Sequence, residues 1–436
     1  MTKNADRQGS NILGISGKSI NQGQKTQVNQ QLGYGEKGKF HKYTLTRRAG
    51  SILYDGAKDA REQHRTCWCH RGVTRPSDSI SVYRQTSGGS ARLNGVTTCK
   101  SVWACPTCSA KICAVRQSEL SDGMKTWSAQ GGYVWLMTLT FPHELDDLLP
   151  VTLEKFGKAK AYFKNSKTYK RILAKGVRKG SVSSLEVTLG EHGWHPHQHD
   201  LVFATKDAYG ETKELEHGRL TSRVIDELKE TWYISLRKAG LCEQSQMSEV
   251  LQYGLDVRGG QFAAEYIAKF GRDQKWGLSR EVTMHAAKIG TDTKGAHPFQ
   301  LLAWADEGDV LAAAQFLAYC QAFEGKRMLS WSRGLKKDLT GTEEITDEQA
   351  AEREMPDEEI VGHIGSEGLS IIQSRHLLAN FLQFVAEHCG SDDAQGHIDE
   401  YLRLAKEMVP RNARGVVKVK LHSCGFEHVD KEKLYA

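Results

Sequence analysis

Histidines at alternate positions in residues 194–203 (Trp-His-Pro-His-Gln-His-Asp-Leu-Val-Phe) place the strongest constraint on how this chain folds. Side chains two positions apart on a β-strand project from the same face. A strand that begins here would therefore let His197 and His199 bind one divalent ion. His195 has the same parity, but Pro196 keeps it in the preceding turn, where it would be an outer ligand or support the ligands through hydrogen bonds. Paired histidines on an exposed strand are also compatible with no metal.

A carboxylate could join these histidines from the segment before them. Residues 184–189 (Ser-Leu-Glu-Val-Thr-Leu) alternate as a strand does, and residues 190–193 form a short link that would fold this strand back as a hairpin partner. Glu186 would then lie beside the histidines. Two imidazoles and one carboxylate, with coordination positions left open, suit Mg²⁺ or Mn²⁺ that also holds a phosphate oxygen.

A tyrosine with a neighbouring lysine supplies a candidate nucleophile. Residues 261–270 follow a Gly-Gly break and have a helical composition, which places Tyr266 and Lys269 three apart on one face. A phenol is a weak nucleophile because its ordinary pKa is about 10. It therefore needs a cation, which Lys269 and the metal ion can supply. The alternative is a core tyrosine beside a lysine that extends to solvent.

Together these residues resemble the HUH endonucleases, and within them the rolling-circle replication initiators of small plasmids. The resemblance covers roughly residues 95–335 and rests on segments 136–142, 185–188, 193–199 and 266–269. It implies an α+β fold, ferredoxin-like or RRM-like, with a central antiparallel sheet and flanking helices, preceded by a zinc-binding region and followed by helical extensions. It also implies that the tyrosine attacks a DNA phosphate, which gives a 5′-phosphotyrosyl link and a free 3′-OH primer.

Two positions depart from the pattern of that family. Gln198 stands between the paired histidines, where a bulky apolar residue is usual. Phe262 stands four positions before Tyr266, where related initiators with one tyrosine often carry an acid. Glu265 is the nearest acid, although it lies about 100° from Tyr266 around a helix. The reaction could therefore be completed by Glu265, by another carboxylate, or by Tyr266 of a second chain.

The composition is that of a globular protein. The 436 residues are 39% hydrophobic and 26% charged, which leaves room for two or three domains. No apolar run reaches the roughly 18 residues of a membrane span, and the polar N-terminus lacks the apolar stretch of a signal peptide, so we expect a cytoplasmic protein. Ten cysteines in that compartment indicate metal binding or burial rather than disulfides.

The cysteines before residue 110 predict a structural zinc site, because a Cys-x2-Cys knuckle with further cysteines upstream can supply four thiolates. The expected ligands are Cys99, Cys105, Cys108 and Cys69, with Cys67 as the alternative to Cys69. His64 or His70 could replace either upstream cysteine. Free cysteines in the core are the alternative to zinc.

Residues 155–179 carry ten basic side chains and no acid, interleaved with aromatic residues. Unopposed charge at this density repels itself unless a polyanion is present, so the segment is expected to form a helix that contacts DNA phosphates. The DNA-contacting residues are expected to be Lys164, Lys167, Lys170, Arg171, Lys175, Arg178 and Lys179. A solvated helix face is the alternative.

The expected organisation has six parts. They are a flexible basic tail (1–60), a zinc-binding region (61–130), the endonuclease domain (131–300), a helical extension (301–338), an acidic linker (339–362) and a C-terminal helical region (363–436). Within the endonuclease domain we expect the histidine strand in the centre of the sheet and helices on one face.

The predicted function is sequence-specific DNA nicking and strand transfer by a metal-dependent enzyme that initiates rolling-circle replication of a plasmid. The expected partners are plasmid origin DNA, single-stranded or extruded as a hairpin, and a host helicase and single-strand binding protein; a homodimer is compatible with this reading. A transposase or a conjugative relaxase could use the same chemistry, but relaxases commonly place the tyrosine before the histidines. A zinc-dependent DNA-binding protein without enzymatic activity is the other alternative.

Overall fold

The computed structural model describes residues 40–74, 79–87, 89–269, 295–353, 357–390, 393–408 and 410, together with the backbone of 419–422 and 425–428. Residues 1–39 of the expected tail lie outside the described residues. The rest of that expectation is wrong from residue 41, where helix α2 (His41–Ile52) begins. This helix is ordered because it buries Leu45 and Ala49 in the same core as the cysteine segment.

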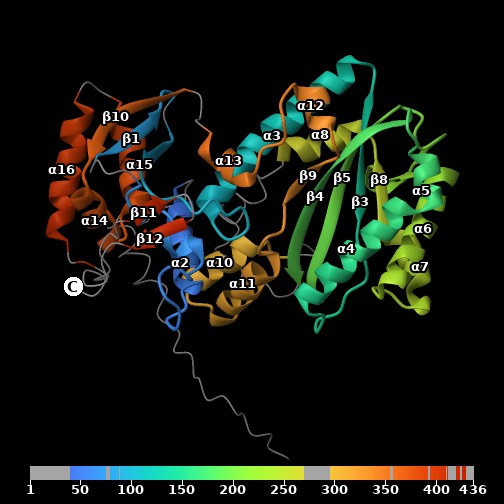
Figure 1. The fold of residues 1–436 in the computed structure, drawn as a ribbon, viewed down its shortest axis with the longest axis horizontal. Coiled ribbons are helices and arrows are strands. Elements are labelled where there is room, and N and C mark those ends of the chain that lie inside the picture. The colour runs from blue at the N-terminus through green and yellow to red at the C-terminus, as the bar shows by residue number, and fades with distance from the viewer. Residues whose placement is uncertain are drawn as a thin grey trace, which may run out of the picture. The chain divides into compact units, whose positions relative to one another are not determined.

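The central sheet has five antiparallel strands in the order β8-β3-β5-β4-β9 (Figure 1). The strands are β3 (Tyr133–Leu139), β4 (Arg178–Gly190), β5 (Gly193–Ala204), β8 (Leu255–Arg258) and β9 (Leu329–Trp331). The predicted α+β fold with an antiparallel sheet and flanking helices is confirmed. The histidine strand is β5, and it lies in the middle of the sheet as expected.

The β4–β5 hairpin is closed by a two-residue turn between Gly190 and Gly193, which are register partners. Gly193 has φ +90°, and a Cβ atom there would lie 2.9 Å from the carbonyl oxygen of Glu144. A side chain at Gly193 would therefore be strained and would clash with backbone. The hairpin tip consequently packs against the loop after β3, which brings that loop beside the histidines.

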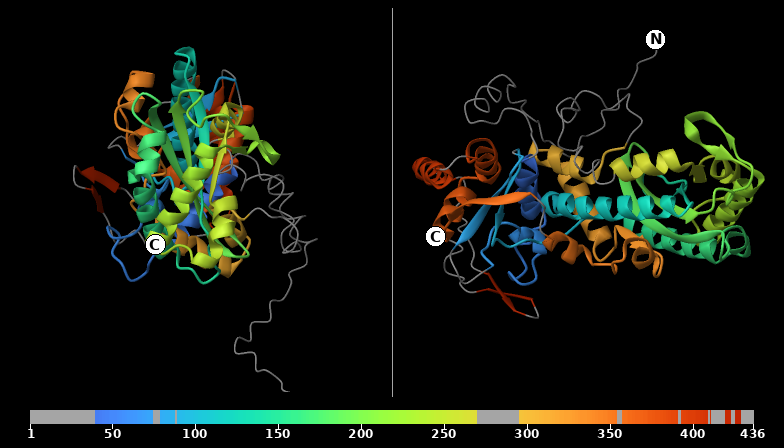
Figure 2. Two further views of the ribbon diagram at one scale, coloured as in Figure 1. Left: turned by 90° about the vertical axis from the view of Figure 1, so that its right-hand side faces the viewer. Right: turned by 90° about the horizontal axis from the view of Figure 1, so that it is seen from above.

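Helices cover both faces of the sheet, so the expectation of helices on one face is wrong. Helices α4, α5 and α6 share a core with Val202 and Ala204 of β5, whereas α3, α8 and α10 share a core with Leu201 and Phe203. The reason is the run 201–204 (Leu-Val-Phe-Ala), which presents apolar side chains to both faces. The helices are α3 (Pro106–Ala129), α4 (Leu149–Asn165), α5 (Lys167–Ile172), α6 (Arg223–Ala239), α8 (Gly260–Lys269) and α10 (Pro298–Asp306). Helix α3 extends from the blue N-terminal segments to the green sheet (Figure 2).

The basic segment 155–179 is not one helix. Ser166 ends α4 and caps α5, because its side chain accepts a hydrogen bond from the backbone N–H of Tyr169 (3.1 Å). Strand β4 then begins at Arg178. The ten basic side chains are therefore divided among two helices, a turn and a strand.

The segment 301–338, expected to be a helical extension, also contributes to the sheet. Strand β9 pairs with β4 and buries Leu329 and Trp331, which is why this short apolar stretch is extended rather than helical. It lies between α11 (Val310–Phe323) and α12 (Leu335–Thr340).

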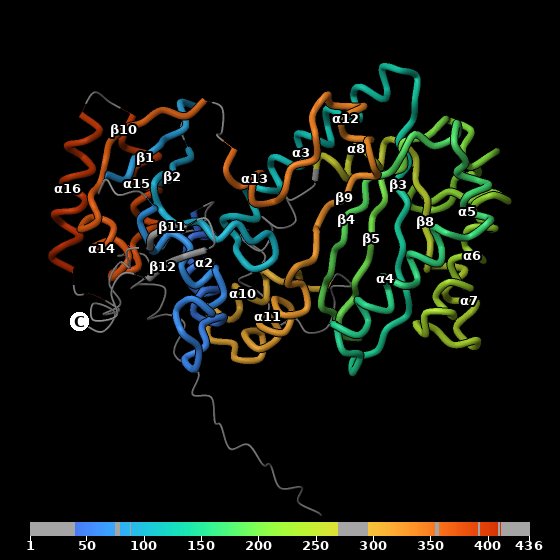
Figure 3. The backbone as a smooth tube through the Cα atoms, in the orientation of Figure 1, coloured from blue at the N-terminus to red at the C-terminus, as the bar shows by residue number. Residues whose placement is uncertain are grey.

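The acidic segment 339–362 is not a linker, because it contains α13 (Asp347–Glu352) and most of β10 (Glu358–Ile364). Strand β10 pairs with β1 (Ile80–Gln85), which also pairs with β2 (Ala91–Asn94), and orange β10 runs beside blue β1 in Figure 3. Several of the acids pair with basic residues of the N-terminal part. Glu358 binds Arg92 (2.6 Å), and Asp347 binds Arg116 (2.8 Å).

The C-terminal helices complete a third core with these N-terminal strands. Leu369, Phe381 and Ile398 are buried in one cluster with Ile80 and Val82. The helices are α14 (Ser366–Ser374), α15 (Leu378–His388) and α16 (Ala394–Glu407), followed by the hairpin β11 (Val419–His422) and β12 (Gly425–His428). Within the described part of the chain, none of the helices combines the length and the apolar character needed to span a membrane.

The remaining short elements connect these layers. They are η1 (Arg65–Trp68), β6 (Lys213–Glu214), η2 (Glu216–Gly218), β7 (Leu220–Thr221), η3 (Gln244–Gln246), α7 (Met247–Glu249) and η4 (Val250–Gly254). The last of these ends at Gly254, directly before β8 begins.

Candidate active site

The β4–β5 hairpin brings Glu186 opposite His197, because the two are register partners on adjacent strands. Its Oε2 atom lies 3.4 Å from Nε2 of His197 and 3.7 Å from Nε2 of His199. One donor atom from each of these three residues lies within 4.8 Å of the others. The three residues predicted as metal ligands therefore converge, and their donors of two imidazoles and one carboxylate fit Mg²⁺ or Mn²⁺.

The second nitrogen of each imidazole is held by a neighbour. Nδ1 of His199 lies 2.9 Å from Oγ1 of Thr138 on β3, and Nδ1 of His197 lies 3.2 Å from the carbonyl oxygen of His195. These contacts fix the ring orientation and leave both Nε2 atoms facing Glu186. Histidines that bind metals are commonly oriented in this way.

Helix α8 places Tyr266 at the same point. The hydroxyl of Tyr266 donates a hydrogen bond to Oε1 of Glu186 (2.6 Å), and its ring centre lies 4.7 Å from that of His199. The helix is anchored by its buried Ala263 and Ile267 against the sheet. Glu186 thus uses one carboxylate oxygen toward the imidazoles and the other toward the phenol.

The pKa values show how these groups influence one another. Burial would raise the pKa of Glu186, but the imidazoles of His199 and His197 and the Tyr266 hydroxyl outweigh it and lower the pKa to about 2. Burial, together with the negative charge of Glu186, raises the pKa of Tyr266 well above its ordinary value. With these residues alone, Glu186 is ionised and Tyr266 is a neutral donor, so activation of the phenol requires an added positive charge.

His195, predicted as an outer ligand, lies outside this three-residue group. Its Nδ1 contacts Nε2 of His143 (2.7 Å), and its Nε2 contacts Oγ1 of Thr140 (3.1 Å). His143 was missed by the sequence interpretation, although it directly follows segment 136–142 of the resemblance. A second residue that was missed is His297, which is half-buried; burial lowers its pKa to about 4, and the negative charge of Glu186 acts in the opposite direction. It caps α10 by accepting a hydrogen bond from the N–H of Phe299 (3.2 Å).

Glu265 and Lys269 are the other two residues predicted to act with Tyr266. Glu265 is exposed, and its carboxylate accepts a hydrogen bond from Gln261 of the same helix (3.3 Å). Lys269 is the last residue of α8, and its side chain lies outside the described residues. Phe262 packs its ring against Gly218, where a Cβ atom would lie 1.9 Å from it.

Gln198, the polar residue between His197 and His199, points to the opposite face of β5. Its amide donates to Oδ1 of Asp200 (2.7 Å) and its carbonyl accepts from Lys160 (2.8 Å). Oδ2 of Asp200, which is fully buried, lies 2.9 Å from Nζ of Lys164. The polar residue between the histidines is thus part of a buried network. The contact of Lys164 with DNA stays a prediction, since its ammonium group is paired with Asp200 while its side chain is 30% exposed.

The other predicted DNA-contacting residues divide into two groups. Arg171 binds Glu227, and Lys179 binds Asp338 (2.7 Å). Arg178 donates to the hydroxyl of Tyr169 (3.2 Å). Lys167, Lys170 and Lys175 are exposed and form no ion pair with the acids that the structure describes. These three remain the better candidates for DNA contacts.

The four expected zinc ligands form a second cluster, which joins the 3₁₀ turn at Cys69, the loop at Cys99 and the start of α3. The Sγ atom of Cys69 lies 3.6 Å from that of Cys105 and 3.8 Å from that of Cys108, and the Cys99–Cys108 distance is 3.7 Å. Four thiolates at about 2.3 Å from zinc lie about 3.8 Å apart in a tetrahedron. The donor set therefore fits zinc.

The structure also decides between Cys67 and Cys69. Cys69 belongs to the cluster, whereas Cys67 is buried beneath Gly50 of α2, where a Cβ atom would lie 3.2 Å from the Cα atom of Cys67. His64 caps η1 by accepting from the N–H of Thr66 (3.2 Å). Neither His64 nor His70 is among the described residues that form the cluster.

Comparison with known proteins gives two relatives of the chain, both from Streptomyces. Protein rep of Streptomyces lividans is 25% identical over 320 residues, which cover 61% of this chain and 68% of the relative. A neomycin resistance protein of Streptomyces cyanogenus is 27% identical over 150 residues, which cover 29% of this chain and 34% of the relative. No family model matches the chain. No solved structure matches it.

Proposed function

We propose that this chain is a plasmid replication initiator that nicks one strand of origin DNA and joins Tyr266 to the 5′ phosphate. Two findings support the proposal: the similarity to Protein rep over 61% of the chain, and the convergence of Tyr266 on the metal-competent group. The observation that carries it is the 2.6 Å hydrogen bond from Tyr266 to Glu186. A tyrosine that served only in packing would have no reason to donate its hydroxyl to this carboxylate. The other oxygen of the same carboxylate faces two imidazoles.

In this proposal Glu186 positions the attacking oxygen. A Mg²⁺ or Mn²⁺ ion held by Glu186, His197 and His199 would supply Lewis-acid polarisation of the phosphate. The phenol oxygen of Tyr266 forms a bond to phosphorus and its proton leaves to solvent, while the hydrogen bond to Oε1 of Glu186 orients the attacking oxygen. The bond from phosphorus to the 3′ oxygen breaks, and that oxygen takes a proton from solvent. The free 3′-OH can prime synthesis.

The buried network behind β5 would hold the histidines in register. Asp200 follows His199 directly, and its ion pair with Lys164 ties the strand to α4. Exposed Lys167, Lys170 and Lys175 would contact the DNA backbone. The phosphotyrosyl ester would be resolved by water activated through Glu265, or by Tyr266 of a second chain.

The test of this proposal is Tyr266→Phe, which removes the attacking oxygen and keeps the ring. The variant should form no covalent adduct on a single-stranded oligonucleotide carrying the origin sequence, while oligonucleotide binding stays within a factor of two or so of wild type because the phosphate-contacting lysines are unchanged. Tyr253→Phe is the matched control, because Tyr253 is an exposed tyrosine. Undiminished adduct formation by Tyr266→Phe would rule out Tyr266 as the nucleophile.

A further inference from the structure

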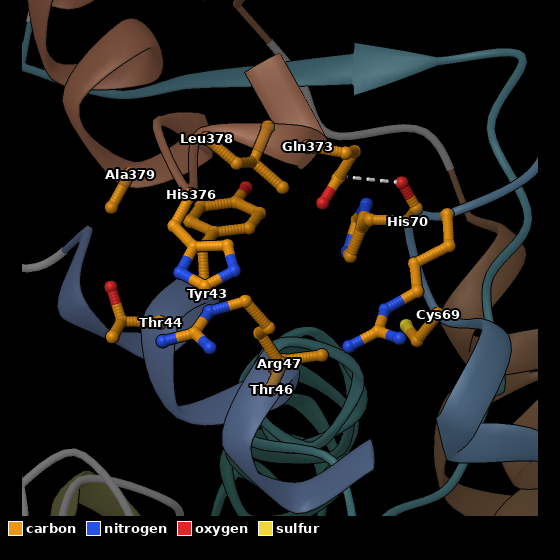
Figure 4. Close-up of a pocket in the computed structure, with 11 residues that line it drawn as sticks. Tyr43, Thr44, Thr46, Arg47, Cys69, His70, Gln373, His376, Leu378 and Ala379 are labelled. Carbon is orange, nitrogen blue, oxygen red and sulfur yellow. Dashed lines mark hydrogen bonds between the residues drawn. The ribbon is translucent and has the colours of Figure 1, made fainter. Parts of the chain in front are cut away.

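A pocket of about 260 Å³ lies between the loop after β3, the first turns of α4 and the segment after α6. It is separate from the pocket of about 20 Å³ in Figure 4, which Cys69 and His70 line and which therefore belongs to the surroundings of the zinc cluster. One water needs about 10–15 Å³ on the same scale. The larger pocket therefore has room for a planar ring such as a nucleobase, whereas the smaller one does not.

The larger pocket combines apolar walls with charged side chains. Leu148, Val151 and Leu241 line it, and the first two are 69% and 45% exposed, so apolar surface is open to solvent here. The charged residues that line it are Glu144, Asp147, Lys155 and Glu243. Apolar walls with a few convergent polar groups are typical of sites that hold a small ligand or one group of a larger one.

Two of these charged side chains lack a partner within the part of the chain that the structure describes. The carboxylate of Glu144 and Nζ of Lys155 form no hydrogen bond or ion pair with any described residue. By contrast, Asp147 accepts a hydrogen bond from the N–H of Glu144 (2.8 Å), and Glu243 lies 3.7 Å from Arg237. Glu144 and Lys155 can therefore bind a ligand that carries both hydrogen-bond donors and a negative charge.

His143 connects this pocket with the candidate active site. It lines the pocket, its Nδ1 donates to the carbonyl oxygen of His192 (2.9 Å), and its Nε2 lies 2.7 Å from Nδ1 of His195. The ring centres of His143 and His195 are 4.8 Å apart, and those of His195 and His197 are 5.4 Å apart. One nucleotide rises about 3.4 Å along a DNA strand, so the pocket lies within about three nucleotides of a phosphate at His197.

We propose that this pocket takes one unpaired base of the DNA strand that is cut, and that the base carries an exocyclic amino group. The strand is the one that the proposed function has Tyr266 attack, and this inference rests on that function. The carboxylate of Glu144 accepts hydrogen bonds from the amino group of cytosine or adenine, whereas thymine presents a carbonyl oxygen there. The apolar walls contact the faces of the ring.

The charges decide which part of the nucleotide enters the pocket. Three of the lining side chains are acids, and like charges repel, so the phosphate stays outside while the uncharged base enters. Lys155 is half-buried at the start of α4 and pairs with the backbone phosphate of the same nucleotide. A nucleotide thus satisfies the carboxylate, the ammonium group and the apolar walls together.

The first experiment measures the binding of short single-stranded probes made only of cytosine, adenine or thymine nucleotides to the full-length, zinc-loaded protein. Divalent ions are left out, so no strand is cut. Wild type should bind the cytosine and adenine probes roughly fivefold more tightly than the thymine probe, at the low end of discrimination by a base contact. Glu144→Ala should remove this preference. Asp146→Ala is the matched control, because Asp146 is an exposed acid of the same loop that does not line the pocket.

The second experiment tests the phosphate contact of Lys155. Lys155→Met should keep the base preference and make the salt dependence of binding (log K against log salt) shallower by about 0.7, the value for one lost phosphate contact on a single strand. Lys125→Met, at a side chain that is 80% exposed on α3, should leave the slope unchanged. Melting temperature and zinc content verify that each variant is folded.

Replacing single nucleotides of an origin oligonucleotide by abasic ones then locates the base. One position within about three nucleotides of the cut should weaken binding by wild type and leave binding by Glu144→Ala unchanged. Equal binding of all three probes by wild type, or a preference that Glu144→Ala retains, overturns the proposal and leaves the pocket to a protein partner. A protein that shows the preference but forms no Tyr266 adduct contradicts the proposed function and keeps the pocket as a site for single-stranded DNA.

Discussion

The two metal-competent clusters found among the described residues differ chiefly in their access to solvent. The four cysteine ligands are between 0% and 5% exposed, whereas the side chain of Glu186 is 38% exposed and those of His197 and His199 are 16% and 17% exposed. A closed set of four thiolates leaves a zinc ion no position for another ligand. Three donors at an open surface leave positions for a phosphate oxygen, so the first cluster is suited to stability and the second to chemistry.

The clusters also differ in what holds them. The cysteines receive hydrogen bonds from their own neighbourhood, such as that from Thr66 to Sγ of Cys99 (3.5 Å) and that from the N–H of Cys108 to Sγ of Cys105 (3.5 Å). The histidine site depends on a hairpin, a neighbouring strand and a helix that returns 80 positions after Glu186 with Tyr266. Loss of a cysteine ligand should therefore lower the stability of the surrounding region strongly. Loss of a ligand in the histidine site should lower activity more than stability.

The largest effect is expected from Cys105→Ser, which removes one thiolate of the closed cluster. Structural zinc sites contribute about 10–16 kcal/mol of binding free energy to folding in zinc-finger peptides, so the variant should lose one zinc per chain and much of its unfolding free energy. Metal analysis by mass spectrometry and denaturant unfolding measure both. Cys67→Ser, at a buried cysteine outside the cluster, should keep its zinc, and equal zinc loss in the two variants would refute the ligand assignment.

Glu186→Gln and His197→Ala should act in the opposite way, with activity lost and the fold kept. Each removes one of three donors, and changes around a metal site typically cost about 10–100-fold in affinity or activity. Nicking of supercoiled origin plasmid should fall at least that far at fixed Mg²⁺, with partial recovery in added Mn²⁺. The zinc content should stay at wild-type level. If wild type nicks equally well without any added divalent ion, the metal mechanism is wrong.

Breaking the buried network of Gln198, Asp200 and Lys164 should cause a smaller loss of stability than loss of a cysteine ligand. Lys164→Met leaves the carboxylate of Asp200 buried without its partner, which costs about 3–5 kcal/mol for a fully buried pair and toward the lower figure here, because the lysine side chain is 30% exposed. Urea unfolding measures this change. Lys158→Met is the matched control on the same helix, because its ion pair with Glu154 is exposed. Equal midpoints for both variants would show that the network contributes nothing.

The smallest effect on the nicking step is expected from Glu265→Ala. The carboxylate is exposed and bonded to Gln261, so strand cleavage should proceed at the wild-type rate. If Glu265 activates the water that resolves the phosphotyrosyl ester, the adduct should persist longer, toward the low end of the roughly 10²–10⁴-fold effect of general-base catalysis. The lifetime of the adduct in a single turnover measures this. An unchanged lifetime would leave Tyr266 of a second chain as the remaining route.

The sequence by itself determined the local patterns that have a fixed period or spacing. Alternation identified the histidine strand and placed Glu186 on its hairpin partner, because a two-residue turn leaves one register for the pair. The Cys-x2-Cys spacing identified Cys105 and Cys108, because a knuckle brings two thiolates together without any distant contact. The α+β class followed from the same patterns.

Tertiary structure alone decided which side chains face one another across distant segments. Charge in the sequence predicted that Lys164 contacts DNA, and only the fold shows that the buried carboxylate of Asp200 pairs with its ammonium group. Charge likewise predicted a linker over 339–362, yet Arg92 neutralises Glu358 and the end of the segment forms strand β10. The pairing of Glu186 with Tyr266 is of the same kind, since residues 80 positions apart meet only when the helix packs on the sheet. Periodicity in the sequence predicts which face of a strand or helix a residue occupies, whereas long-range packing determines which residues that face contacts.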